Sequence, residues 1–174
     1  METNSTSVTP PSVGLRYGLL TGLVSIIFSF ILFVTQMDQS PIRWLGLVVL
    51  IAGMLMAHNA YKQANGGFME YSEGLGIGAS MSVVSGVLST AFSYVYMKFV
   101  DPEYMGRIME TTRAKMEAKG NMTDEQIDQA MSMAQKFSTA GWMILFGILG
   151  SLLFGFLIAL VVSAITKNPK PEFE

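Results

Sequence analysis

The chain has 174 residues, of which 51% are hydrophobic and 14% are charged, and its formal net charge is −2. Soluble domains carry about 25% charged residues, and nucleic-acid-binding proteins carry basic clusters that are missing here, so neither class fits the composition. There is no cysteine, which excludes disulfides, thiolate nucleophiles and cysteine metal sites.

The charged residues are segregated along the chain. Thirteen of them lie between Lys98 and Lys136, and long uncharged stretches lie on either side. This segregation is typical of membrane proteins. The sequence therefore predicts an all-α polytopic membrane protein: a bundle of four transmembrane helices with an amphipathic two-helix segment between the third and fourth spans.

The first span is predicted at about residues 15–37. Residues 1–13 are polar and contain a Pro-Pro pair, so we expect a disordered N-terminal tail. A signal peptide is the alternative, but its apolar core would be about 7–15 residues, shorter than the uncharged run from Tyr17 to Met37. Gly14, Gly18 and Gly22 give this span a small face that could meet a partner helix.

The second span is predicted at about residues 43–61. Its uncharged stretch between Arg43 and Lys62 has 18 residues, which is close to the shortest length that crosses a bilayer. Trp44 and Tyr61 lie near its two ends, where interfacial aromatic residues are common.

The third span is predicted at about residues 74–98, and the rest of the chain is organised around it. Small residues recur in it at intervals of three or four, which places them on one face of a helix and lets another backbone approach closely. This helix-packing ridge consists of Gly74, Gly78, Ser82, Gly86 and Ser89.

Two extramembrane helices are predicted at about residues 102–119 and 123–138. Asp101 is a suitable N-cap for the first, Gly120 ends it, and Thr123 with Gln126 forms a capping box for the second. Apolar residues at helical spacing give each helix one apolar face, so we expect both to lie near the membrane surface.

The fourth span is predicted at about residues 139–166, inside a run of 30 uncharged residues that starts at Phe137. Small residues recur in it every four positions and form a second ridge with Gly147, Ser151 and Gly155 as members. Residues 168–174 are a C-terminal tail. The four spans are expected to form a single membrane domain over residues 14–167.

Three groups of residues resemble those of one known family. They are Gly67-Phe68-x-x-Tyr71-x-Glu73-Gly74-x-x-x-Gly78, then Tyr96-x-x-Phe99-x-Asp101-Pro102, and finally Ile165-Thr166-Lys167. In this order, over about residues 15–167, they resemble the bacterial integral-membrane family, common in Bacteroidota, that is catalogued as domain of unknown function 4199. The resemblance implies a four-helix protein of the inner membrane and implies no activity.

One group of polar residues gathers at the ends of the second and third spans: His58, Asn59, Lys62, Glu70 and Glu73. A histidine with two carboxylates could hold a divalent metal or handle protons. The spacing matches no tight metal motif, however, and carboxylates at a helix N-terminus are favoured by the helix dipole alone. We therefore expect a solvated rim at the membrane interface, with no catalytic, cofactor or metal site.

The spans carry no charged residue in mid-bilayer, and no nucleophile, phosphate-loop or zinc motif is found. We therefore expect no enzyme activity and no cofactor. The two ridges favour a structural or accessory protein that acts through helix association, as a homo-oligomer or with a membrane-protein partner. The alternative is a small transporter or channel for an uncharged or lipidic solute.

Orientation follows from the basic residues that flank the spans. Four of them lie beside the termini, at Arg16, Lys62, Lys167 and Lys170, and seven lie beside the opposite ends of the spans. The bare count places the helical segment in the cytoplasm, whereas the basic N-terminus usual in the family places the termini there. We expect cytoplasmic termini.

Overall fold

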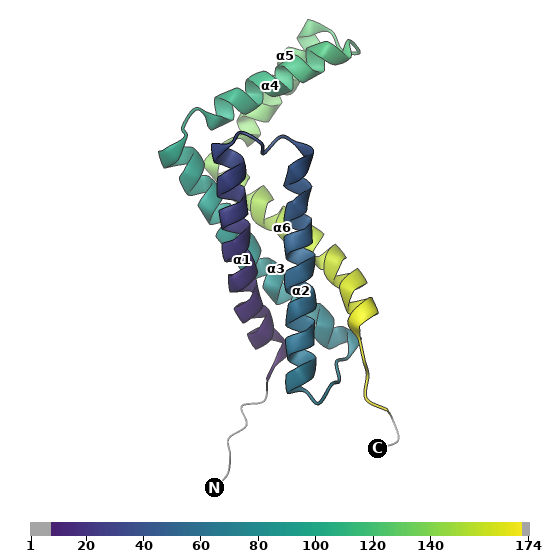
Figure 1. Cartoon of the computed structure of the whole chain (residues 1–174). Coiled ribbons are helices and arrows are strands. Elements are labelled where there is room, and N and C mark those ends of the chain that lie inside the picture. The colour runs from purple at the N-terminus through teal and green to yellow at the C-terminus, as the bar shows by residue number, and fades with distance from the viewer. Residues whose placement is uncertain (1–7, 172–174) are drawn as a thin grey trace. The chain divides into compact units, whose positions relative to one another are not determined.

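The structure is a computed structural model that describes residues 8–171, so most of the predicted N-terminal tail and the end of the C-terminal tail lie outside the described residues. It is all-helical, as the sequence predicts. In chain order its elements are α1 (Pro10–Val34), η1 (Pro41–Trp44), α2 (Leu45–Ala64), α3 (Tyr71–Val95), η2 (Tyr96–Val100), α4 (Tyr104–Lys119), α5 (Asp124–Phe137) and α6 (Ala140–Thr166) (Figure 1).

Four segments of this order are long and apolar enough to cross a membrane. They are Pro10–Val34, Pro41–Ala64, Tyr71–Val100 and Ala140–Thr166, with 25, 24, 30 and 27 residues. A helix rises about 1.5 Å per residue, so each of them exceeds the roughly 30 Å of a hydrocarbon core. The prediction of four spans is confirmed.

The helix α1 begins earlier than the sequence predicts. Residues 10–13 were assigned to a disordered tail, but they form its first turn. Proline is compatible with this position because the first N–H groups of a helix have no partner within it. The turn is also held by packing, since Val13 is buried in the core. The predicted tail is therefore too long by these four residues.

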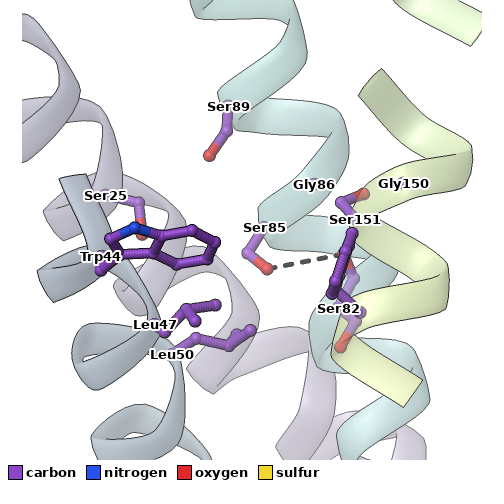
Figure 2. A pocket seen from close by; sticks show the side chains of 12 residues that line it. Ser25, Trp44, Leu47, Leu50, Ser82, Ser85, Gly86, Ser89, Gly150 and Ser151 are labelled. Atoms are coloured by element: carbon purple, nitrogen blue, oxygen red, sulfur yellow. Dashed lines mark hydrogen bonds between the residues drawn. The ribbon is translucent and has the colours of Figure 1, made fainter. Parts of the chain in front are cut away.

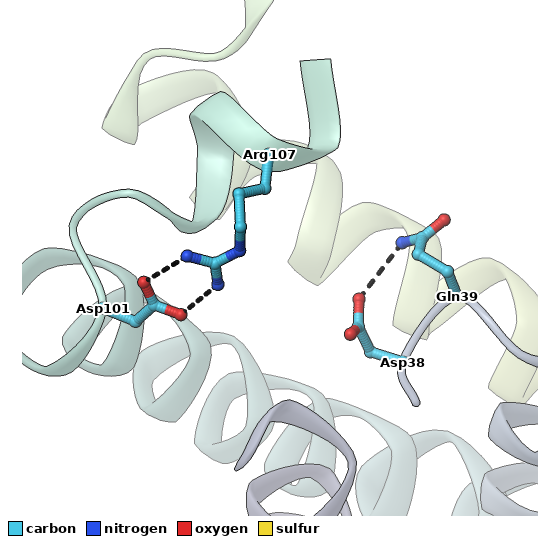
Figure 3. A network of polar contacts seen from close by, with 4 residues as sticks. All are labelled: Asp38, Gln39, Asp101 and Arg107. Atoms are coloured by element: carbon cyan, nitrogen blue, oxygen red, sulfur yellow. Dashed lines mark hydrogen bonds and ion pairs between the residues drawn. The ribbon is translucent and has the colours of Figure 1, made fainter. Parts of the chain in front are cut away.

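The chain divides into two compact units. The first comprises residues 8–89 and 148–171 of the described chain, and the second comprises Thr90–Gly147. In the first unit, α1 and α2 form an antiparallel hairpin (Figure 1). Its turn contains a side-chain contact in which Gln39 Nε2 donates to Asp38 Oδ2 over 3.2 Å (Figure 3).

Within the first unit, α3 and α6 pack in an antiparallel register with steps of four residues. A Cβ added to Gly78 would lie 2.5 Å from Ala159 Cβ, so the two backbones are in close contact there. Each step of four along α3 meets a step of four back along α6, and each pair joins a glycine to a small residue. The pairs are Gly74 with Ser163, Gly78 with Ala159, Ser82 with Gly155, and Gly86 with Ser151.

The helix α1 packs against α3 through its own glycines. A Cβ on Gly18 would lie 3.0 Å from Met81 O and 2.9 Å from Val84 Cβ, and Gly14 and Gly22 meet α3 one turn to either side. The hypothesis that this glycine face meets a partner molecule is therefore wrong. The face is filled by α3 of the same chain.

A methionine-rich core lies between these helices. It contains Met54 and Ala57 of α2, Ile77 and Met81 of α3, and Ala159 of α6, all fully buried. Unbranched methionine side chains adapt to the irregular space between helices that approach closely at small residues. Met69 lies before α3 and exchanges two backbone hydrogen bonds, of 2.9 and 2.8 Å, with Asn168 after α6.

The second unit contains the predicted extramembrane helices, α4 and α5. The capping box of Thr123 and Gln126 is present, and Gly120 ends α4 in the left-handed conformation at φ 64°. Arg113 joins the two helices, because it donates to Glu117 Oε1 over 2.9 Å in α4 and to Asp128 Oδ1 over 2.8 Å in α5. These hydrogen bonds raise the pKa of Arg113.

Asp101 was predicted to be the N-cap of α4, and this prediction is wrong. The helix α4 begins only at Tyr104, and Asp101 instead makes a bidentate ion pair with Arg107 (Figure 3). Its backbone still starts the turn, since Tyr104 N donates to Asp101 O over 3.1 Å. The hydrogen bond from Arg107 holds the pKa of Asp101 below its ordinary value.

Candidate functional site

A groove of about 330 Å³ lies among the four spans in the first unit. Its residues come from α1, η1, α2, α3 and α6, and Figure 2 shows Trp44, Leu47 and Leu50 across from Gly150 and Ser151. The complete lining is Ser25, Trp44, Gly46, Leu47, Leu50, Ser82, Ser85, Gly86, Ser89, Gly150, Ser151 and Phe154. This volume is within the range of about 300–1,000 Å³ that is usual for small-molecule pockets.

Gly150 is the glycine that leaves part of the groove open. Among residues 8–171, nothing lies within 4 Å of a Cβ added to Gly150, whereas a Cβ on Gly46 would be in ordinary contact with the ring of Phe28, at 3.7 Å, and one on Gly86 would collide with Ser151. Gly150 lies one residue before Ser151 of the packing ridge, so it is turned away from the contact with α3. Glycine here leaves space that no neighbouring side chain fills.

Three of the five serines in the groove present acceptor oxygens, because their hydroxyl hydrogens are already used. Ser82 donates to Gly78 O over 2.7 Å, Ser85 to Met81 O over 2.9 Å, and Ser151 to Ile148 O over 2.8 Å. Each hydroxyl thus uses its hydrogen within its own helix, which is usual for serine in a span. Ser82 Oγ and Ser151 Oγ lie against Gly155 and Gly86 in the contact between α3 and α6, and the hydroxyls add a few acceptor oxygens to an otherwise apolar lining.

Trp44 stands at one end of the groove with 57% of its surface exposed. In Figure 2 its ring lies next to Ser25 and above Leu47 and Leu50. Indole combines a flat apolar surface with one N–H donor, which suits a residue at the membrane interface. The groove therefore runs from an interfacial tryptophan to serines near the middle of α3.

The predicted polar cluster is only partly assembled. His58 is fully buried and contacts two helices, with Nε2 3.1 Å from Gly74 O and Nδ1 2.8 Å from Thr166 Oγ1. Lys62 Nζ donates to Thr166 O over 3.2 Å. Asn59 is exposed and does not join them.

The two acids of the cluster serve the start of α3. Tyr61 OH donates to Glu73 Oε1 over 2.6 Å, and the backbone N–H of Glu70 donates to Glu73 Oε2 over 2.8 Å. The Glu70 side chain is exposed. Glu73 therefore satisfies an otherwise free N–H at the helix start and also joins α2 to α3.

The interpretation of the cluster as a solvated rim is wrong for His58, because the packing of α2, α3 and α6 encloses its ring completely. Among residues 8–171, no three His, Asp or Glu residues come together closely enough to hold a metal ion. Thr166 appears in the sequence analysis only within the closing group Ile165-Thr166-Lys167, and nothing in the sequence marks it as the partner of His58.

The predicted ridge residues lie on the contact between α3 and α6, with two exceptions. Ser89 lies beside that contact and lines the groove. Gly147 belongs to the second unit, where a Cβ on it would lie 2.8 Å from Thr90 Oγ1. Three other ridge residues, Ser82, Gly86 and Ser151, both pack and line the groove. The sequence marked these positions as packing residues and did not indicate the groove.

Comparison with known proteins gives one match. The family described as "Protein of unknown function (DUF4199)" matches residues 16–168, which is nearly the whole chain. No curated protein and no solved structure matches.

Proposed function

The chain belongs to the DUF4199 family of proteins of unknown function, and we propose that it is a non-enzymatic membrane protein that binds one uncharged, lipidic molecule in the groove. The observation that carries this proposal is the apolar groove together with the open space at Gly150, beside a contact between α3 and α6 that is tightly packed. An unfilled apolar groove forfeits dispersion contacts along its whole lining. In a bilayer the abundant molecules that can restore those contacts are lipids.

The chemistry of the lining defines the ligand further. Leu47, Leu50 and Phe154 supply apolar surface, and the serines supply hydroxyl oxygens that accept hydrogen bonds. None of the described residues that line the groove is charged. A long apolar molecule with a hydroxyl or amide donor, such as a lipid with a small neutral head, complements this lining.

The hypothesis of action through helix association has less support. Its motive was a surplus of small-residue faces, and the face of α1 and the ridges of α3 and α6 are occupied within the chain. Large apolar side chains cover the outer face of α6, for example Leu149, Leu153 and Leu157. Lipid tails satisfy such side chains as well as a second protein does.

Native mass spectrometry of the purified protein tests the proposal. We expect the wild-type protein to retain one lipidic molecule after a detergent wash. Gly150→Leu should lose it, because Gly150 lines the groove and a larger side chain there takes up space that the lipid needs. Gly141→Leu is the matched control, since Gly141 is on the same helix, is equally unobstructed and lies outside the groove.

Two outcomes contradict the proposal: a wild-type protein without bound lipid, or equal retention by Gly150→Leu and Gly141→Leu. Flux into proteoliposomes then separates binding from transport. Specific flux that Gly150→Leu abolishes would identify the protein as a transporter for the same lipidic solute.

We also propose that the protein lies in the bacterial inner membrane with both ends of its chain in the cytoplasm. The four spans place both ends on one side, and Lys167 and Lys170 follow the last span closely, as basic residues do on the cytoplasmic side. A reporter enzyme that is active only in the periplasm, fused after Glu174, should be inactive. An active fusion would reverse the orientation.

A further inference from the structure

His58 is the only histidine of the chain, and it is fully buried at the junction of α2, α3 and α6. Histidine is the side chain whose charge ordinarily changes between about pH 5 and pH 8. A buried histidine that served packing alone would need only one protonation state to be satisfied. The hydrogen-bond partners of His58 can satisfy two protonation states, the neutral ring and the charged ring.

The first contact fixes one proton. Nε2 lies 3.1 Å from the backbone oxygen of Gly74. A carbonyl oxygen only accepts hydrogen bonds, so Nε2 carries a hydrogen in every state of the ring. In the neutral ring Nδ1 is therefore an acceptor, and the proton that charges the ring is gained at Nδ1.

The second contact adapts to that proton. Thr166 Oγ1 lies 2.8 Å from His58 Nδ1 and 2.7 Å from the backbone oxygen of Val162, one turn back along α6. The hydroxyl has a single hydrogen, which can point to one of these two partners at a time. When Nδ1 is bare, the hydroxyl donates to it. When Nδ1 carries a proton, Nδ1 donates to Oγ1 and the hydroxyl turns to Val162.

From this geometry we propose that His58 is a reversible proton-binding site, in which Nδ1 takes up a proton from water and the Thr166 hydroxyl rotates to match. Every ring nitrogen and the hydroxyl keep a hydrogen-bond partner before and after uptake, so neither state leaves a buried polar group unsatisfied. The site is separate from the groove, and it stands whether or not a lipid binds there.

The charged groups near the ring come from α2, from the start of α3 and from the segment after α6. Lys62 lies one turn further along α2, and its ammonium is bound to Thr166 O. Glu73 of α3 is held by Tyr61 OH and Glu70 N, and the Glu70 side chain is exposed. The helix α6 contributes no charged residue within Ala140–Thr166, and Lys167 after it is exposed.

Thr166 also lies between His58 Nδ1 and the water at the end of the bundle. The His58 ring has no exposed surface, whereas Thr166 and Lys62 are half-buried at the end of the bundle. Proton exchange between Nδ1 and water therefore takes place on the Thr166 side of the ring. Proton binding thus changes the bond that ties the end of α6 to α2, which makes the junction sensitive to pH on that face of the membrane.

Nitrogen-15 NMR of the full-length protein in lipid nanodiscs tests the proposal, because labelled histidine gives the signals of His58 alone. We expect the neutral ring to carry its hydrogen on Nε2. As the pH falls through the range from about 8 to 5, a second hydrogen should appear on Nδ1 while the protein stays folded. A neutral ring protonated at Nδ1, or a ring that stays neutral until the protein unfolds, would overturn the proposal.

Two variants isolate the hydroxyl. Thr166→Val keeps the shape and removes the hydroxyl, and Thr166→Ser keeps the hydroxyl. Charge-assisted hydrogen bonds are about twice as strong as neutral ones, so loss of the hydroxyl harms the charged ring more.

The midpoint of Thr166→Val should therefore fall by about one pH unit, a tenfold loss of proton affinity, whereas Thr166→Ser should titrate like the wild type. Equal midpoints for the two variants would refute the role of the hydroxyl. If Thr166→Val does not fold, the tautomer and the titration of the wild-type protein decide the proposal.

Discussion

Glycine has opposite effects on packing in two regions of the first unit. Around Gly78, glycine lets α3 and α6 approach until a Cβ would lie 2.5 Å from its neighbour. Around Gly150, on the same α6, glycine leaves space in which a Cβ meets nothing within 4 Å. The first closes a helix contact and the second opens a groove. What separates them is the position relative to the four-residue register, not the glycine itself.

The largest effect is expected where glycine closes the contact. Gly78→Leu must force α3 away from Ala159 and Met54, both of which are buried. Overpacking of this kind typically costs about 1–3 kcal/mol. We expect a clear fall in melting temperature in detergent and a lower steady-state level in cells.

Val83→Leu and Val87→Leu are the controls on the same helix, because both valines are exposed, at 41% and 44%. A larger apolar side chain that faces lipid should leave the melting temperature unchanged. If Gly78→Leu melted at the same temperature as these two, the close contact between α3 and α6 would not exist in the membrane.

A second substitution tests whether the glycine face of α1 is internal. A Cβ on Gly18 would press on the backbone of Met81, which cannot move aside as a flexible side chain can. Gly18→Leu should therefore destabilise the protein about as much as Gly78→Leu. Size-exclusion chromatography with light scattering distinguishes the rival hypothesis. If the glycine face of α1 met a second molecule, Gly18→Leu would change the oligomeric state of the protein with little change in its melting temperature.

Much of the architecture could be predicted from the sequence because it follows from one-dimensional patterns. The spans follow from uncharged length, the ridge of α6 from its four-residue repeat, and the start of α5 from its capping box. The ion pair of Arg113 with Glu117 follows from their spacing of four. Each of these features depends on residues that are close in the chain.

The groove and the buried histidine depend on residues that are far apart in the chain. Gly150 is one position away from a ridge residue, and only the register of α6 against α3 shows that it faces empty space. His58 looks like an interfacial residue until the end of α6 supplies Thr166, 108 positions later. The periodicity of a single helix therefore predicts neither the space at Gly150 nor the burial of His58.

The ion pair of Asp101 and Arg107 differs from the contact at Gly78 and from the groove at Gly150. Its side chains are partly exposed and lie outside the spans. Folding lowers the pKa of Asp101, so the pair stabilises the protein above the ordinary aspartate pKa of about 3.9. That contribution is lost as the pH falls through the lowered value. Asp101→Asn should lower the melting temperature slightly at neutral pH, far less than Gly78→Leu.

The measurement for this pair is the difference in melting temperature between Asp101→Asn and the wild type over a pH series. The difference should shrink to zero at acid pH. A difference that stayed constant through the acid range would show that the carboxylate charge plays no part in it.

Lipid-dependent melting tests the central claim, that glycine opens a ligand groove at Gly150, most directly. A molecule that binds only the folded protein raises its melting temperature as its concentration rises. With increasing amounts of a neutral lipid such as diacylglycerol added to the detergent, the wild type and Gly141→Leu should melt at progressively higher temperatures, and Gly150→Leu should not respond. An equal rise in all three proteins would show that lipid stabilises them through their outer surface, and that the groove is not a binding site.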